Sequence, residues 1–221
     1  MSIDFHFAWQ TLIDGWPLFG YGIAMTLTFA IVGTVAGLII GLLLGAIRSL
    51  EIDPLDSSSI KALKKFGRGL TSFYVWIFRG TPMMVQAVFL YYLLKPIFHW
   101  DGLTAGLIII SINTAAYMAE IIRSGIQAID RGPQAIKNSF PSIGNQLIVN
   151  IKDSCMLNAI AVTELYFQAT SIAGSTMKYT EIYMLVAIMY LALTTIATFV
   201  LNTIEKKLNK TNKATTMDAC A

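Results

Sequence analysis

Thirty consecutive residues, from Leu18 to Ile47, carry no charged side chain. As a helix rising 1.5 Å per residue, this run would be about 45 Å long, which exceeds the roughly 30 Å hydrocarbon core of a bilayer. Only 13% of the chain is charged, against about 25% in soluble domains, so we expect most of it to lie in lipid. The apolar runs extend over about twenty residues instead of alternating over ten, which favours helices over a barrel. The sequence therefore predicts an all-α membrane protein.

The apolar runs predict five transmembrane helices, preceded by an external N-terminal segment (1–17) and followed by a cytoplasmic tail (205–221). The spans expected within the transmembrane domain (18–204) are about 18–47, 83–98 with an amphipathic lead at 66–78, 103–122, 142–167 and 183–204. The segment Arg79-Gly80-Thr81-Pro82 separates the second span from its lead, because proline cannot continue the preceding helical turn without a kink.

The cations are clustered between the apolar runs. Twelve of the 16 Lys and Arg residues lie in the connectors 48–68 and 123–141 and in the tail. Cytoplasmic segments of membrane proteins carry such an excess of cations, so we expect the N-terminus outside and the C-terminus inside. The net charge of +3 is then explained by cations that flank membrane-spanning helices, and we expect no nucleic-acid partner.

Four glycines recur at every fourth position of the first span: Gly33, Gly37, Gly41 and Gly45. On a helix they would form a bare ridge that another helix can approach closely, which matters in lipid because packing there depends on close contact. The spacing predicts a helix-packing surface; the alternative is chance in a glycine-rich helix.

The fourth expected span contains polar residues at helical spacing: Gln146, Asn150, Ser154 and Asn158. Positions i, i+4, i+8 and i+12 share one helical face. Unpaired polar groups in hydrocarbon cost several kcal/mol each, so this face must meet protein or water. Two interpretations are open: the face borders a substrate path, or it forms hydrogen bonds that hold helices together.

Further candidates for the substrate path are Asn113, Lys152, Asp153 and Glu164. Lys152 and Asp153 diverge by about 100° on a helix and need partners elsewhere. Asn113 suits interhelical bonding or a ligand, and Glu164 could meet a substrate ammonium. Glu120, near the inner end of the third span, is predicted to be a structural partner for a cation.

The sequence carries no pattern typical of an enzyme. His6 and His99 have no metal partner at helical spacing, so we expect no metal site and no catalytic residues. No glycine-rich phosphate loop occurs, and we expect no cofactor in this chain. If ATP hydrolysis powers the protein, a partner subunit must bind the nucleotide.

Several motifs together are similar to one known family. They are Phe78-Arg79-Gly80-Thr81-Pro82, the stretch 116–129 with Ala119-Glu120 and Arg123-Ser124-Gly125, the stretch 141–146, and Ile151-Lys152-Asp153-Ser154. On these residues the chain resembles the permease subunits of ATP-binding-cassette (ABC) importers for polar amino acids, over nearly its whole length.

This resemblance implies a type I importer in the cell membrane. Two permease subunits, identical or related, enclose a path; an extracytoplasmic binding protein delivers the amino acid, and two cytoplasmic ATP-binding subunits drive alternating access. The resemblance leaves open which amino acid is carried and whether the permease pairs with a copy of itself.

One departure from the family concerns the loop that docks on the ATPase. Members of the family carry a Glu-Ala-Ala segment and a glycine there, whereas here Gly132 is followed at once by Pro133. About twenty residues, several helical turns, are missing relative to that pattern. The residues expected to face the ATPase are Gly125, Gln127, Asp130, Arg131, Gly132 and Lys137.

The short loop predicts poor transmission of ATP hydrolysis, so the permease is expected to be impaired or to rely on a partner subunit for docking. Two other functional classes are open. An ATP-independent transporter or channel would take up substrate without the ATPase, and a non-transporting membrane scaffold would assemble without flux.

Overall fold

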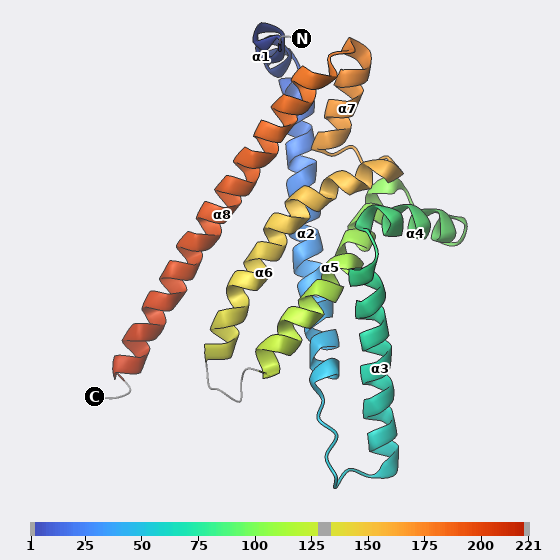
Figure 1. Cartoon of the computed structure of the whole chain (residues 1–221), viewed down its shortest axis with the longest axis vertical. Coiled ribbons are helices and arrows are strands. Elements are labelled where there is room, and N and C mark those ends of the chain that lie inside the picture. The colour runs from blue at the N-terminus through green and yellow to red at the C-terminus, as the bar shows by residue number, and fades with distance from the viewer. Residues whose placement is uncertain (1–2, 128–133, 219–221) are drawn as a thin grey trace.

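The computed structural model describes residues 3–127 and 134–218, and this described part consists of helices without strands (Figure 1). In chain order the helices are α1 (Phe5–Asp14), α2 (Trp16–Ser49), α3 (Ser58–Gly80), α4 (Met83–Phe98), α5 (Gly102–Gln127), α6 (Gln134–Asp153), the 3₁₀ helix η2 (Ser154–Ile160), α7 (Leu165–Thr176) and α8 (Tyr179–Asp218).

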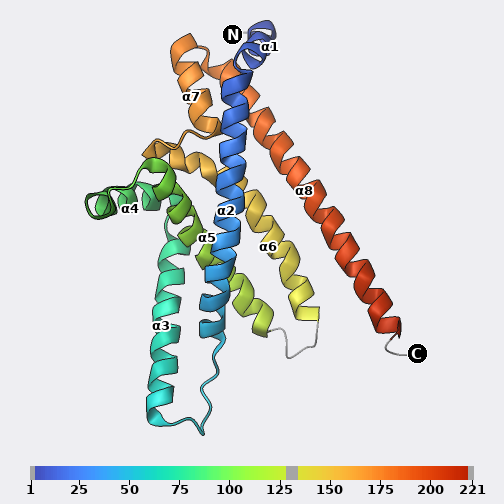
Figure 2. The same cartoon turned by 180° about the vertical axis from the view of Figure 1, so that it is seen from behind.

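The long helix α2 is the axis of the fold. It includes the predicted span 18–47 and extends by a few residues at each end, with Pro17 in its first turn, where a missing N–H costs nothing. Figure 2 shows α2 in front of α5 and α6, with α8 diverging from it toward the C-terminus. One apolar core gathers Phe29, Ile109 and Leu157 from α2, α5 and η2. A second core gathers Phe19 and Ile182 with α7 near the N-terminal end of α2.

The predicted break before Pro82 is present. Helix α3 ends at Gly80, Thr81 and Pro82 are extended, and α4 begins at Met83. The axes of α3 and α4 differ by 113°. The amphipathic helix is longer than the predicted 66–78, because Ser57 caps it and accepts a hydrogen bond from the Ile60 N–H.

Three described helices are long and apolar enough to cross a membrane by themselves: Trp16–Ser49, Gly102–Gln127 and Tyr179–Lys207. The bent α3–α4 pair would be a fourth crossing if it forms one broken span. The last crossing belongs to α8, which continues to Asp218, so the boundary expected at 204–205 does not coincide with a helix end.

The predicted fourth span, 142–167, is not one helix. Helix α6 ends at Asp153, η2 follows, and Ala161 adopts a left-handed conformation with φ 61° before α7 begins. The chain therefore turns within the stretch that hydropathy alone joins. The predicted polar connector 123–141 also differs, because α5 continues to Gln127 and α6 already begins at Gln134.

Candidate functional site

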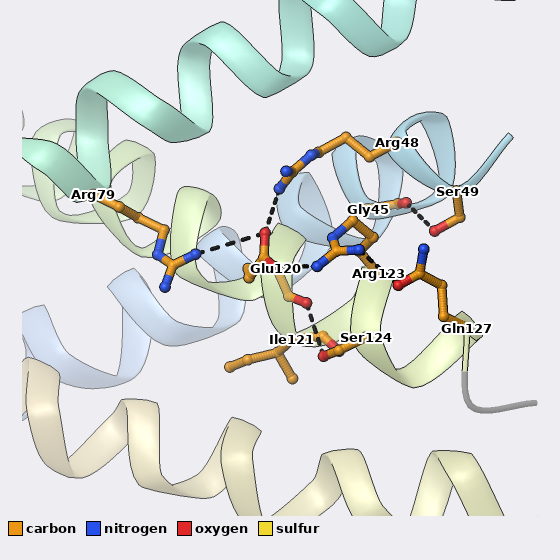
Figure 3. Close-up of polar contacts among 9 residues, drawn as sticks. All are labelled: Gly45, Arg48, Ser49, Arg79, Glu120, Ile121, Arg123, Ser124 and Gln127. Atoms are coloured by element: carbon orange, nitrogen blue, oxygen red, sulfur yellow. Dashed lines mark hydrogen bonds and ion pairs between the residues drawn. The ribbon is translucent and has the colours of Figure 1, made fainter.

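Three arginines converge on Glu120, a cluster that we call the Glu120 cluster (Figure 3). Arg48 of α2 and Arg123 of α5 each donate to its carboxylate at 2.5 Å. Arg79, at the end of α3, lies 3.6 Å away and also stacks over the Tyr117 ring at 5.6 Å. The predicted role of Glu120 as a partner for cations is thus confirmed, and the carboxylate joins three helices.

The charges of the Glu120 cluster do not balance. Three guanidinium groups surround one carboxylate, so the cluster carries a net charge of +2 at the ends of α2, α3 and α5. Arg123 gains a further acceptor in Gln127, at 2.6 Å. The last residue of α5 is Gln127, and the predicted ATPase-facing loop follows it. The Glu120 cluster therefore holds in place the helix that leads into this loop.

Gln86, just after the bend between α3 and α4, was not among the predicted site residues. Its amide nitrogen donates to the carbonyl oxygens of Phe78 and Thr81, at 2.9 and 2.8 Å, and its oxygen accepts from Asn113 at 2.8 Å. It therefore ties both sides of the bend to α5. Asn113 is buried in this contact, which is the interhelical role that the sequence left open. The one available signal was a glutamine within an apolar run directly after the Pro82 break.

Three members of the predicted polar face, Gln146, Asn150 and Ser154, point into the subunit. Asn150 donates to the Thr34 hydroxyl of α2 at 2.8 Å and accepts from the Thr114 hydroxyl of α5 at 3.0 Å. Gln146 donates to Asn150 at 3.4 Å, and Ser154 donates to the Ile151 carbonyl. The two Asn150 contacts are interhelical hydrogen bonds, whereas those of Gln146 and Ser154 are local to α6 and the start of η2.

The fourth member, Asn158, does not continue that face. The α-helical repeat that would align it with Asn150 stops at Asp153, and Asn158 lies in η2, where it is half-buried. The face predicted from i, i+4 spacing is therefore interrupted where the helix changes type.

Glu164 is buried at the N-terminus of α7. Its carboxylate accepts from the Tyr166 and Phe167 N–H groups, both at 2.8 Å, and from the Tyr190 hydroxyl of α8 at 2.7 Å. Thr26 of α2 caps the neighbouring Leu165 N–H. In this structure Glu164 thus satisfies a helix end and is closed to a substrate ammonium.

Lys152 and Asp153 lie at the end of α6, and they differ in exposure. Asp153 is half-buried, whereas Lys152 is exposed in a groove between α6 and α8. We call this the α6–α8 groove; around Lys152 its lining is Ile148, Thr194, Thr195, Thr198, Phe199 and Asn202.

The four glycines of α2 are all buried against α5. A Cβ atom added to Gly33, Gly37 or Gly45 would lie 2.9, 2.6 or 2.8 Å from Ile110, Thr114 or Ile122, respectively. At Gly41 it would overlap with Met118. Real Cβ contacts are longer than these distances, so the α2–α5 approach requires glycine at these positions.

The predicted ATPase-facing residues are only partly described. Gly125 and Gln127 lie in the last turns of α5. Asp130, Arg131 and Gly132 lie outside the described residues, as does the side chain of Lys137 in α6. Within the described part of the chain, no group of three His, Cys, Asp or Glu side chains could hold a metal ion.

Comparison with known proteins identifies close relatives. Residues 57–133 match the family described as binding-protein-dependent transport system inner membrane component. The arginine transport system permease protein ArtQ of Bacillus subtilis (strain 168) is 31% identical, with 94% of this chain and 98% of the relative covered. The glutamine transport system permease protein GlnP of Escherichia coli (strain K12) is 30% identical, with 91% and 98% covered.

Solved structures agree with this assignment. A chain from the crystal structure of an amino acid ABC transporter with histidines superposes with a TM-score of 0.78 at 31% identity, covering 94% of this chain and 100% of that one. A chain of the inward-facing MetNI methionine ABC transporter has a TM-score of 0.70 at 18% identity, with 88% and 97% covered, which supports the fold alone.

The structure has apolar helices able to cross a membrane, and buried hydrogen bonds and the Glu120 cluster join them. The sequence matches amino-acid permeases over nearly its full length. The chain therefore belongs to the family of permease subunits of ABC importers for polar amino acids, integral inner-membrane proteins whose ATP hydrolysis takes place in a separate subunit.

Proposed function

We propose that this subunit forms half of the translocation path of an ATP-driven importer of a polar amino acid, working by alternating access. The observation that carries the proposal is the 31% identity to an arginine permease over 94% of the chain. Because two relatives are named as arginine and glutamine transport permeases, these two amino acids are the first cargoes to test.

The proposed assembly has two permease subunits, two cytoplasmic ATP-binding subunits and an extracytoplasmic binding protein. The proposed topology has five crossings, with the N-terminus outside and the C-terminus inside. The cation-rich segment 48–68, from the end of α2 to the middle of α3, and the C-terminal part of α8 would then both face the cytoplasm. A reporter fused at either end of the chain tests the orientation.

We also propose that the coupling loop after α5 is shortened. In the sequence Gly132 is followed at once by Pro133, without the roughly twenty residues, several helical turns, that the family pattern has there. Two comparisons support this proposal. The family match ends at residue 133. The alignment with ArtQ runs over 231 residues, although 94% of this 221-residue chain is only about 208 residues.

A shortened loop would weaken the response of the ATPase to cargo. The test compares the chain, purified with its ATPase, with a variant that carries the corresponding loop of Bacillus subtilis ArtQ after Gly132. We expect cargo-stimulated hydrolysis to rise several-fold in the loop variant. Strong stimulation by the unmodified chain as a homodimer would refute impairment, and stimulation only with a second permease would assign docking to that partner.

Of the eight proposed path residues, Lys152, Asp153 and Asn158 are those best placed to meet cargo in this conformation. Asn113, Gln146, Asn150, Ser154 and Glu164 are buried and hydrogen-bonded within the subunit. For these five residues, a role in the path requires a different conformation of the subunit.

A further inference from the structure

The short helix α1 has three sides with different surroundings, and two of them are those of an ordinary surface helix. One side packs on the protein: Ala8 is buried, and Phe7 and Leu12 contact the core that includes Phe19. A second side is polar and exposed, and it consists of His6, Gln10 and Asp14. Residues four apart share a helical face, so this polar side is continuous along α1.

The third side of α1 is apolar and exposed. Phe5, Trp9 and Ile13 also recur at every fourth residue, and they are 68%, 64% and 58% exposed. At about 100° per residue, these three side chains lie between the packed side and the polar side. We call them the α1 stripe. Because the stripe holds three large apolar side chains in a row, it requires an apolar environment outside the subunit.

Gly15 separates α1 from α2 and lets the two helices differ in direction. Its N–H donates to the Thr11 carbonyl oxygen at 2.9 Å, and a Cβ atom added to Gly15 would lie 2.8 Å from the same oxygen. In both views α1 is seen partly end-on and does not continue the line of α2, which is seen from the side (Figure 1 and Figure 2). Helix α1 therefore runs across the axis of α2, as does a helix that lies in the plane of a membrane surface.

The depth of α1 follows from the length of α2. From Trp16 to Arg48, the first Lys or Arg of the chain, α2 rises by about 48 Å, or about 45 Å along the membrane normal at the average tilt of about 20°. A bilayer with its headgroups is about 40–45 Å thick. With Arg48 among the inner headgroups, α1 lies at the level of the outer headgroups.

The surroundings of the α1 stripe agree with this depth. Trp16 and Leu18, in the first turn of α2, are 56% and 48% exposed, so the apolar surface continues from α1 onto a membrane-crossing helix. Tryptophan is enriched at membrane interfaces, where one side of the ring is apolar and its N–H meets water. The charged residue of α1, Asp14, lies on the polar side and not in the stripe.

We propose that α1 is a membrane-surface helix that inserts Phe5, Trp9 and Ile13 into the outer headgroup region and turns its polar side to water. The inference rests on the proposed topology with the N-terminus outside. The first 47 residues contain no Lys or Arg, so the partner is the apolar boundary of the headgroup region and not an anionic headgroup.

This contact would set the depth of two crossings at once. Helix α1 packs against the outer ends of both α2 and α8. The Asp4 N–H donates to the Glu181 carboxylate of α8 at 3.3 Å, and the Lys178 ammonium lies 5.5 Å from the centre of the Phe7 ring. Insertion of the α1 stripe would therefore hold both helices at the membrane surface.

Spin labels on two neighbouring residues test whether the stripe meets lipid or water. The full chain with its ATPase, in phosphatidylcholine nanodiscs and with Cys155→Ser and Cys220→Ser, receives Trp9→Cys or, as the matched control, Gln10→Cys. Both positions are exposed, so a nitroxide fits at either one. Oxygen concentrates in lipid, whereas nickel-EDDA stays in water. We expect the ratio of oxygen to nickel-EDDA collisions to be at least about fivefold higher at residue 9 than at residue 10.

Three results would overturn the proposal. Equal ratios at the two residues would show that the stripe does not enter the membrane. High access of nickel-EDDA to both residues would fit a docking surface for the extracytoplasmic binding protein and would refute the lipid contact. A difference that arises only in nanodiscs with added phosphatidylglycerol would assign the contact to anionic headgroups instead of the apolar boundary.

Labelling of intact cells separates this inference from the proposed topology. A membrane-impermeant maleimide should label Gln10→Cys from outside. Labelling only after lysis would refute the outside location of the N-terminus, and with it the outer position of α1. Labelling from outside together with equal collision ratios would refute only the membrane contact. Neither measurement requires transport, so an absence of uptake would bear on the proposed function alone.

Discussion

Helix α6 has two polar sides with opposite properties. Toward α2 and α5, Asn150 is buried and its amide is hydrogen-bonded to Thr34 and Thr114. Toward α8, Lys152 and Asn145 are exposed, and no hydrogen bond to a described residue satisfies either side chain. Polar residues in this helix are therefore either bonded between helices or left open at the surface of the subunit, and their spacing alone does not distinguish these two arrangements.

The buried side of α6, which faces α2 and α5, depends on the close packing of these two helices. We expect the double substitution Gly37→Leu and Gly41→Leu to destabilise the fold by about 3 kcal/mol or more, because leucine side chains would overlap with Thr114 and Met118. Size-exclusion chromatography in mild detergent should show loss of the monodisperse protein. The control is Gly20→Leu on the same helix, where an added Cβ has no neighbour within 4 Å. Equal behaviour of the two variants would contradict the packing role.

The Glu120 cluster gives the next largest effect. Glu120→Gln leaves three guanidinium groups without their carboxylate, and we expect a loss of roughly 1–2 kcal/mol after allowing for partial solvent screening. The apparent melting temperature of the purified subunit measures it. Glu51→Gln, at an exposed carboxylate near Arg68 in the adjacent pocket, should have little effect. A larger loss for Glu51→Gln would show that this end of α5 is stabilised in another way.

The two sides of α6 can be compared directly by one pair of variants. Asn150→Leu removes two interhelical hydrogen bonds and should cost about 1 kcal/mol, in line with such bonds in membranes. Asn145→Leu, five residues earlier and exposed, should leave stability unchanged. The measurement is the melting temperature of both variants in the same detergent. If Asn145→Leu lowered it more than Asn150→Leu, the interhelical role would belong to the side that faces α8.

The smallest effect on stability is expected away from both sides of α6, in the connector before α3. Lys64 donates to the Asp56 carboxylate at 2.6 Å, and this hydrogen bond lowers the pKa of Asp56 from its ordinary value of 3.8. Because the folded-state pKa is the lower one, the stabilisation is present above about pH 4 and is lost as the pH falls through the folded-state pKa. Melting temperatures of the wild type and Asp56→Asn should differ slightly at pH 7 and converge as the pH falls below the folded-state pKa of Asp56. A constant difference would exclude this titration.

Several features followed from the sequence because they depend on neighbouring residues in the chain. The uncharged run 18–47 gave α2 within two residues at each end, and Pro82 marked the bend to α4. The segment 142–167 was misread as one helix. Hydropathy averages over the turn at Ala161 and does not register that Glu164 caps a new helix.

The amino-acid sequence by itself determined that this chain lies in a membrane, that it is helical, and that four glycines share one face of α2, since these properties depend on composition and periodicity. Only the tertiary structure decided which helix faces each polar residue. Thr34, Thr114 and Asn150 are far apart in the sequence, as are Lys152 and Asn202, and a side chain is either satisfied or left open by groups that the fold brings beside it. For that reason Asn150 became part of the interior, while Lys152, two residues later, remained at an open groove.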